Sequence, residues 1–168
     1  MVLPSRQGGI KPASTHFGAG SGPSFKVKNM SYTPPGSAVR SAMIGRVKFN
    51  ADGLIAAIAQ QHDSGEVLML AWMNAEALDE TLRTGRVCYY SRSRSGLWRK
   101  GETSGQVQTL IDARLDCDRD AVLLLVDQKG VACHTGRRNC FYNALRPEGI
   151  VEITQPEIAA ETLYGSKG

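Results

Sequence analysis

The apolar residues of this chain fall into short segments separated by turn residues. Residues 54–60 and 67–73 lie on either side of the turn at 62–65, and this pattern predicts a β-hairpin. Residues 106–115 alternate weakly between apolar and polar, and residues 121–126 form a continuous apolar run, so both are predicted to be strands. Three further short strands are expected at residues 87–91, 97–98 and 131–133.

Helical signals occur at two places. Asn74 is a favoured N-cap residue, Gly85 is a favoured C-terminal residue, and between them Leu78 and Leu82 share one helical face. Residues 154–157, Thr-Gln-Pro-Glu, have the capping-box pattern and predict a second helix near the C-terminus. We therefore expect an α+β, β-rich domain of short antiparallel strands with about two helices. The absence of regular strand–helix–strand alternation argues against a doubly wound nucleotide-binding fold.

Composition divides the 168 residues into three parts. In residues 1–45, Gly, Pro and Ser supply 19 of the 45 positions and the apolar residues show no period, which predicts a disordered basic tail. The folded domain is expected over residues 46–150, followed by a C-terminal helix and tail over residues 151–168. The front segment also has the serine-rich, acid-free composition of a transit peptide, and a translation start at Met30 or Met43 is a further alternative.

The charge is unevenly distributed. The net charge is +4, but residues 1–50 contain seven basic residues and no acidic one, which leaves 13 basic and 16 acidic residues in positions 51–168. The basic character belongs to the front of the chain, so it is a weak reason to expect nucleic-acid binding. The longest apolar run has six residues, too few to span a bilayer, and no secretory signal is apparent. We therefore expect a cytoplasmic protein with reduced thiols.

Three carboxylates surround a thiol in the sequence Asp116-Cys117-Asp118-Arg119-Asp120. On an extended strand the carboxylates would share one face and the thiol would lie on the other. Carboxylate oxygens suit Mg²⁺ and a thiolate suits Zn²⁺, so this short segment could serve two different metals. The alternative is an acidic edge exposed to water.

Cys133 and Cys140 join Cys117 in a set with the spacing Cys-x15-Cys-x6-Cys. Three thiolates leave one tetrahedral position open, which is the arrangement of a catalytic zinc that holds a water. A structural zinc site would need a fourth ligand, which Cys88 or His134 could supply. Any one of these cysteines could instead be a small buried apolar residue, and we favour that interpretation for Cys88.

Residues 91–105 combine cations, hydroxyl groups and glycines around Trp98. Arg92, Arg94 and Lys100 are candidates to bind phosphate groups, and Trp98 could stack on a base. The alternatives are a basic hairpin tip in water and a packing role for the tryptophan.

Together and in this order, these segments resemble the phosphoribosyl-AMP cyclohydrolase family of histidine biosynthesis. The resemblance runs from about residue 47 to residue 147 and rests on five separate motifs. The motifs are VLMLAWMN at 67–74, YYSRSR at 89–94, LW at 97–98 with KGE at 100–102 and SG at 104–105, DCDRD at 116–120, and CHTG at 133–136 with CFY at 140–142.

The resemblance implies a monofunctional hydrolase that opens the adenine ring of phosphoribosyl-AMP at its N1–C6 bond, giving a formimino-carboxamide imidazole. It also implies an intertwined homodimer whose zinc sites are shared between subunits. Asn139 departs from the family pattern, which usually has Ser at this position. The implied zinc ligands are Cys117, Cys133 and Cys140, and the implied magnesium ligands are Asp116, Asp118 and Asp120.

The residues are compatible with that chemistry. Alkylation at N1 makes C6 of the ring electrophilic, and zinc lowers the pKa of a bound water to about 7, which supplies hydroxide at neutral pH. His134, next to Cys133, is the candidate for proton transfer. We expect neither nucleic acid nor membrane as a partner. The competing hypothesis is a zinc-stabilised nucleic-acid-binding module with Cys88 as a fourth ligand, and the net charge of −3 over residues 51–168 argues against it.

Overall fold

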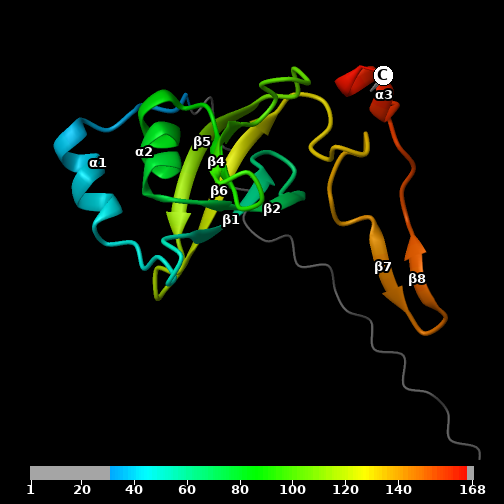
Figure 1. Cartoon of the computed structure of the whole chain (residues 1–168), viewed down its shortest axis with the longest axis horizontal. Helices are drawn as coiled ribbons and strands as arrows, with labels where there is room; N and C mark the ends of the chain where they lie inside the picture. Colours follow the sequence, from blue (N-terminus) through cyan, green and yellow to red (C-terminus); the bar gives the residue numbers. More distant parts are fainter. Residues whose placement is uncertain (1–30, 166–168) are drawn as a thin grey trace, which may run out of the picture.

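A six-stranded sheet with helices against one side forms the body of the protein, and the computed structural model describes residues 31–165 (Figure 1). The strand order in this sheet is β4-β3-β2-β1-β6-β5, and β7 and β8 form a separate two-stranded sheet. The elements are α1 (Ser37–Ile44), β1 (Ile55–Gln61), β2 (Val67–Met73), α2 (Ala75–Thr84), β3 (Cys88–Ser91), β4 (Gly96–Arg99), β5 (Gln108–Leu115), β6 (Ala121–Gln128), β7 (Asn143–Arg146), β8 (Gly149–Glu152) and α3 (Ala160–Tyr164).

The sheet is mixed, because one of its strand pairs is parallel. The predicted hairpin of β1 and β2 is confirmed, with Ile55 opposite Met73 in an antiparallel register. β6 pairs with the other edge of β1 in parallel, from Ala56 opposite Ala121 onward. The α+β class is therefore confirmed, but the expectation of antiparallel strands alone is wrong at this central pair. Parallel pairing arises because the chain runs through α2 and three more strands before it returns beside β1.

One face of the central strands is buried and the other is half-buried. Alternate residues of β1 and β6 are inaccessible, among them Ile55, Ala57 and Leu124. They pack with Leu78 and Leu82 of α2, which covers this face. The predicted caps of α2 are present, because the Asn74 side chain accepts a hydrogen bond from Ala77 N at 2.8 Å and Gly85 adopts a φ of 70°.

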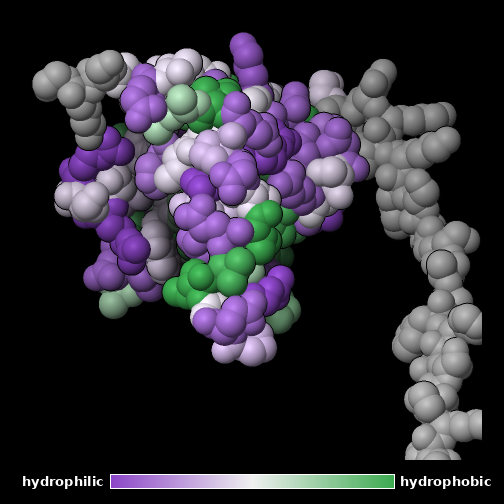
Figure 2. Space-filling view, turned by 90° about the vertical axis from the view of Figure 1, so that its right-hand side faces the viewer, coloured by the Kyte–Doolittle hydropathy of each residue, from purple (hydrophilic) through white to green (hydrophobic). Residues whose placement is uncertain are grey.

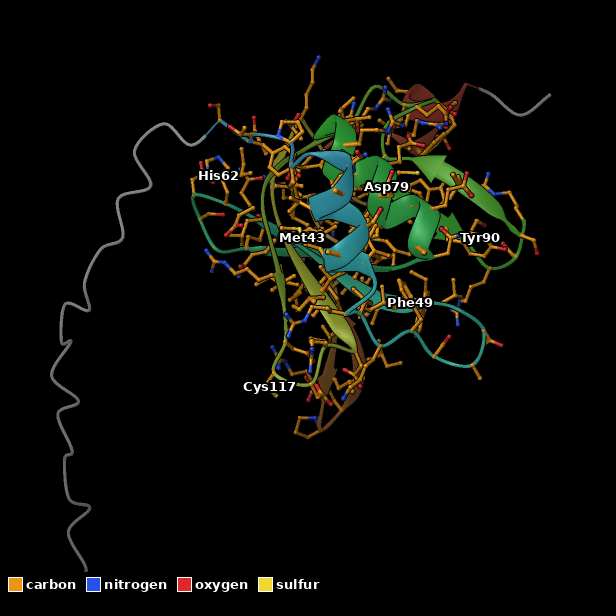
Figure 3. The ribbon with its side chains drawn as sticks, turned by 90° about the vertical axis from the view of Figure 1, so that its left-hand side faces the viewer. Met43, Phe49, His62, Asp79, Tyr90 and Cys117 are labelled. Atoms are coloured by element: carbon orange, nitrogen blue, oxygen red, sulfur yellow. The ribbon has the colours of Figure 1, made fainter. Side chains whose placement is uncertain are left out.

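Residues 31–45 belong to the folded body, which corrects the prediction of a disordered tail up to residue 45. Figure 1 shows α2 lying between α1 and the sheet. Tyr32 donates a hydrogen bond to the carbonyl oxygen of Leu82 at 2.7 Å, and Arg40 pairs with Asp79 of α2 at 2.9 Å. Asp79 is labelled in Figure 3. The sequence signal was weak because α1 buries no residue completely and packs mainly on another helix. Residues 1–30 lie outside the described part of the chain.

The Tyr32 hydroxyl offers a direct test of this docking. Tyr32→Phe removes one half-buried hydrogen bond, so the free energy of unfolding should fall by about 1 kcal/mol in chemical denaturation. Tyr90→Phe is the matched control, because no hydrogen bond joins the Tyr90 hydroxyl to another described residue. Equal stability of Tyr32→Phe and the wild type would show that this hydrogen bond does not contribute to holding the N-terminal segment on α2.

The C-terminal part differs from the predicted pattern. Residues 131–133 form a loop rather than a strand, and the last helix begins at Ala160 instead of near residue 154. The β7–β8 hairpin was not predicted, and it extends away from the six-stranded sheet (Figure 1). Its apolar side chains are open to solvent, with Leu145 80% and Ile150 72% exposed, and Figure 2 shows hydrophobic residues gathered on this side of the molecule. Among residues 31–165, no helix has the length and apolar character needed to cross a membrane.

Candidate metal and substrate sites

A cavity of about 870 Å³ brings together five of the residues singled out in the sequence. Its walls come from β2, from β4 and the turn after it, from the loop that follows β6, and from α3. The predicted residues that line it are Arg94, Trp98, Lys100, His134 and Cys140.

The basic segment divides between this cavity and the neighbouring surface. Arg94 lines the cavity, and its only described side-chain contact is a long hydrogen bond of 3.4 Å to Ser91. Trp98 also lines it and packs against Tyr89, with ring centroids 5.0 Å apart. Arg92 is not among the residues that line the cavity, and its guanidinium lies 5.1 Å from the centre of the Trp72 ring. Of the two arginines in the turn between β3 and β4, Arg94 is therefore the one available to bind a ligand in the cavity.

Two of the three predicted zinc ligands lie together in the loop after β6. Cys133 is buried, and its sulfur lies 3.1 Å from the Thr135 hydroxyl. Cys140 lies beside Cys133, and the residue as a whole is exposed. Partial desolvation of its thiol is the main cause, and the neighbouring Cys133 the second, of a rise in the pKa of Cys140 to about 12. A cation bound to such a thiol displaces its proton, so the pair suits a thiophilic metal.

Lys100 places an ammonium group close to these sulfurs. It is 5% exposed, and burial lowers its pKa, whereas nearby Cys140 and Cys133 act in the opposite direction. Removing a lysine from water is costly unless negative charge lies near it. Two metal-binding thiolates would provide that charge.

The loop that carries the thiols is fixed by polar contacts to β2 and to the turn before it. Asn139 uses both ends of its amide, because its nitrogen donates to Glu66 at 2.7 Å and its oxygen accepts from Phe141 N at 2.9 Å. Cys140 N also donates to the carbonyl oxygen of Leu68 at 2.8 Å. Asn139 thus holds the backbone on either side of Cys140, and this departure from the expected Ser is compatible with an ordered site.

A buried amide network under the loop was missed in the sequence. Gln108 is fully buried; it accepts a hydrogen bond from the Tyr89 hydroxyl at 2.7 Å and donates to Gln128 at 2.9 Å. Gln128 donates in turn to the carbonyl oxygen of Lys129 at 2.7 Å. The available signal was that Gln108 shares a strand face with Leu110, which marks an inward-facing polar residue.

The three aspartates converge in the turn between β5 and β6. One oxygen from each of Asp116, Asp118 and Asp120 lies within 4.8 Å of the others. The segment is bent, with a φ of 69° at Arg119, and is not the extended strand considered in the sequence analysis. The carboxylates converge because of this turn, not because alternate residues of a strand share a face. Hydrogen bonds from backbone groups, led by that of Ala121, lower the pKa of Asp116, whereas Asp118 raises the pKa of Asp120 by repulsion. A divalent cation would relieve that repulsion.

Cys117 lies in the same turn, far from the other two thiols. Figure 3 shows it at the edge of the molecule. Cys117 lines a small hollow there with Met43 and Arg46. The eight residues of β6 separate this turn from the loop of Cys133, a length of about 25 Å at the usual strand rise. Among the described residues, the aspartates form the one cluster of three metal-binding groups. A single chain therefore supplies two thiols at one end of β6 and one thiol at the other.

Comparisons with known proteins agree on one family. The family model described as phosphoribosyl-AMP cyclohydrolase matches residues 69–142. The chain is 65% identical over 136 residues to the phosphoribosyl-AMP cyclohydrolase of Gluconobacter oxydans, covering 81% of this chain and 86% of that protein. It is 66% identical over 129 residues to that of Paramagnetospirillum magneticum, covering 76% and 98%.

The chain belongs to the phosphoribosyl-AMP cyclohydrolase family. The resemblance drawn from the motifs and the assignment to this class of enzyme are thereby confirmed. All the candidate site residues fall inside the matched range 69–142, whereas α1 and the segment after β8 lie outside it.

Cys88, the alternative fourth ligand, does not lie at a surface site. It is fully buried in the core, where Thr81 donates to its carbonyl oxygen at 3.2 Å and accepts from its amide at 2.9 Å. Burial is the main cause, and the nearby Glu80 carboxylate the second, of a rise in the pKa of Cys88 to about 11. Its surroundings are those of a core residue in this cyclohydrolase-family domain.

Proposed function

We propose that the chain hydrolyses the N1–C6 bond of the adenine ring in phosphoribosyl-AMP, the ring-opening step of histidine biosynthesis, in the cytoplasm. The support for the substrate is membership of the family, together with a cavity large enough for a nucleotide. The proposed zinc site needs its cysteines reduced, as the cytoplasm would keep them, and no disulfide joins the four cysteines of the described residues.

The cavity offers cations for the two phosphate groups of this substrate. Arg94 is the best placed, because it has no carboxylate partner among the described residues. Arg99 also lines the cavity but is already held by Glu80, with its second nitrogen 2.8 Å from the carboxylate. Lys100 is buried close to the thiols of Cys133 and Cys140. We therefore propose that it balances the negative charge of these thiolates and does not bind phosphate directly. Trp98 presents an aromatic surface for the base.

The thiol arrangement supports a zinc site built from two chains. Cys133 and Cys140 of one subunit would hold the metal together with the thiol of Cys117 from a second copy, which removes the problem of their separation within one chain. The exposed apolar residues of β7 and β8, and the half-buried face of the central sheet, give that second copy surfaces to cover. Bound zinc would act as a Lewis acid that lowers the pKa of a water to about 7.

The protein's own groups would position substrate and protons around that metal. His134 follows the ligand Cys133 and lines the cavity, so it can exchange a proton with the ring nitrogen or with water. Asp116, Asp118 and Asp120 would hold Mg²⁺, with their oxygens already converging. A magnesium ion next to Cys117 would then lie close to the shared site, where it could bind a phosphate group of the substrate.

The proposal is tested by incubating the protein with phosphoribosyl-AMP and following the absorbance change of ring opening. We expect turnover that a zinc chelator abolishes and zinc restores. Cys88→Ser is the control variant and should keep both zinc and turnover, because Cys88 lies in the core. Salt-dependent RNA binding without turnover would contradict the proposal and favour the nucleic-acid-binding hypothesis.

A further inference from the structure

After β8 the chain runs back to the cavity. This segment is hydrogen-bonded to the loop that carries the predicted zinc ligands Cys133 and Cys140. Glu157 N and Ile158 N both donate to the carbonyl oxygen of Gly136, at 2.8 and 3.2 Å. Arg137 donates from Nε to the carbonyl oxygen of Thr154 at 3.0 Å. We refer to residues 153–165 as the C-terminal strap.

The fit between the loop and the strap is too close for a side chain. A Cβ atom on Gly136 would lie 1.7 Å from the carbonyl oxygen of Ile158, and the φ of +78° at this glycine also disfavours other residues. The Arg137 guanidinium lies 4.0 Å from the centre of the Tyr142 ring and pairs with Glu152 at 2.6 Å. Leu163 of α3 is buried, which anchors the far end of the strap. The strap is therefore seated on the site by specific contacts.

Its other side forms part of the cavity wall. Ala160, Glu161, Tyr164 and Gly165 all line the cavity that also holds Arg94 and Cys140. Within residues 31–165, Glu161 makes no side-chain hydrogen bond or ion pair, and the Tyr164 residue is 44% exposed. A carboxylate without a hydrogen-bond partner among the described residues and a partly exposed aromatic ring thus line the space proposed for the substrate.

We propose that the strap is a substrate-binding wall, in which Glu161 accepts hydrogen bonds from ribose hydroxyl groups and Tyr164 packs its ring against the nucleotide. The inference rests on the proposed function. A carboxylate repels phosphate, but it is a strong acceptor for hydroxyl donors, and the two riboses carry the hydroxyl groups of this substrate. The phosphates then lie toward Arg94.

Steady-state kinetics with phosphoribosyl-AMP test this assignment. Glu161→Gln should raise KM about tenfold, because a charge-assisted hydrogen bond to substrate is weakened, while kcat stays within about twofold. Tyr164→Ala should raise KM by a similar factor, and Tyr164→Phe should not, since the ring carries the contact. Glu157→Gln is the matched control, because Glu157 lies in the strap but outside the cavity wall. Zinc content and melting temperature should stay at wild-type values in all four variants.

The outcomes separate this inference from the proposed function. Turnover by the wild type establishes the function whatever the variants do. If Glu161→Gln and Tyr164→Ala then keep the KM of the wild type and of Glu157→Gln, the strap is not part of the substrate site. A fall in kcat at unchanged KM would also overturn the binding role. Absence of wild-type turnover would instead refute the proposed function.

Discussion

Cys117→Ser and Cys133→Ser subunits, each inactive alone, should recover about a quarter of wild-type activity when mixed in equal amounts and allowed to exchange. The expectation follows from the separation of the two thiols by the length of β6 within one chain. If each zinc takes Cys117 from one subunit and Cys133 with Cys140 from the other, a two-fold dimer has two equivalent sites. In a mixed dimer one site then receives both lesions and the other receives none.

The size of the recovery follows from counting sites. Random exchange makes about half of the dimers mixed, and half of the sites in each mixed dimer are intact, so about a quarter of all sites are active. Zinc bound per subunit should recover by the same fraction, which provides a measurement independent of turnover.

A second pair of variants is the matched control. Cys133 and Cys140 lie in one loop and would serve the same site, so mixing Cys133→Ser with Cys140→Ser leaves a lesion at every site. This pair should recover nothing. Recovery by both pairs, or by neither once mass spectrometry has shown mixed dimers, would refute zinc sites shared in this way.

The local pattern of the chain was sufficient to predict the elements that depend on nearby residues. The β1–β2 hairpin, the caps of α2 and the strand before Asp116 were found because turn residues and periodicity act over a few positions. The parallel pairing of β1 with β6 was missed, because nothing local states which distant edge a strand will meet. Helix α1 was missed for a related reason: Tyr32 and Arg40 are fixed by partners on α2, about 40 to 50 positions away in the chain.

The candidate site shows the same contrast between features set by nearby residues and features set by distant contacts. Residue types and spacing suggested Cys133 with Cys140, and the aspartates, because metal ligands of one loop or turn lie close in sequence. The same pattern could not show that Cys117 is remote from the other thiols, since that depends on the path of β6. Glu161 could not be identified either, because its place in the cavity wall comes from contacts that the strap makes with Gly136.

Asp118→Asn should weaken Mg²⁺ binding about tenfold or more and reduce the stabilisation of the protein by Mg²⁺ accordingly, while leaving bound zinc in place. Asp118 is the cleanest member of the cluster to change, because it makes no hydrogen bond with the described residues. Asp116, by contrast, accepts hydrogen bonds from the amides of Asp120 and Ala121, at 3.0 and 3.2 Å. Changing Asp116 would disturb the turn itself, and with it the position of Cys117.

The sign of the effect on stability distinguishes a cation site from an ordinary acidic turn. Without metal, Asp118 repels Asp120 and raises its pKa, so Asp118→Asn should melt at the same temperature as the wild type or slightly higher in EDTA. Excess Mg²⁺ should raise the melting temperature of the wild type, because the cation binds only the folded turn, and should raise that of the variant clearly less at the same Mg²⁺ concentration.

Asp127→Asn removes the same charge from an exposed position on β6 outside the cluster, and it should respond to Mg²⁺ as the wild type does. An equal response of Asp118→Asn and Asp127→Asn would show that the converging carboxylates do not hold the ion. Loss of zinc together with Mg²⁺ in folded Asp118→Asn would show that the turn cannot serve the two metals separately. Retention of zinc with a reduced Mg²⁺ response would mean that the three aspartates and the thiol of Cys117 bind different ions, although all four lie in the turn that bends at Arg119.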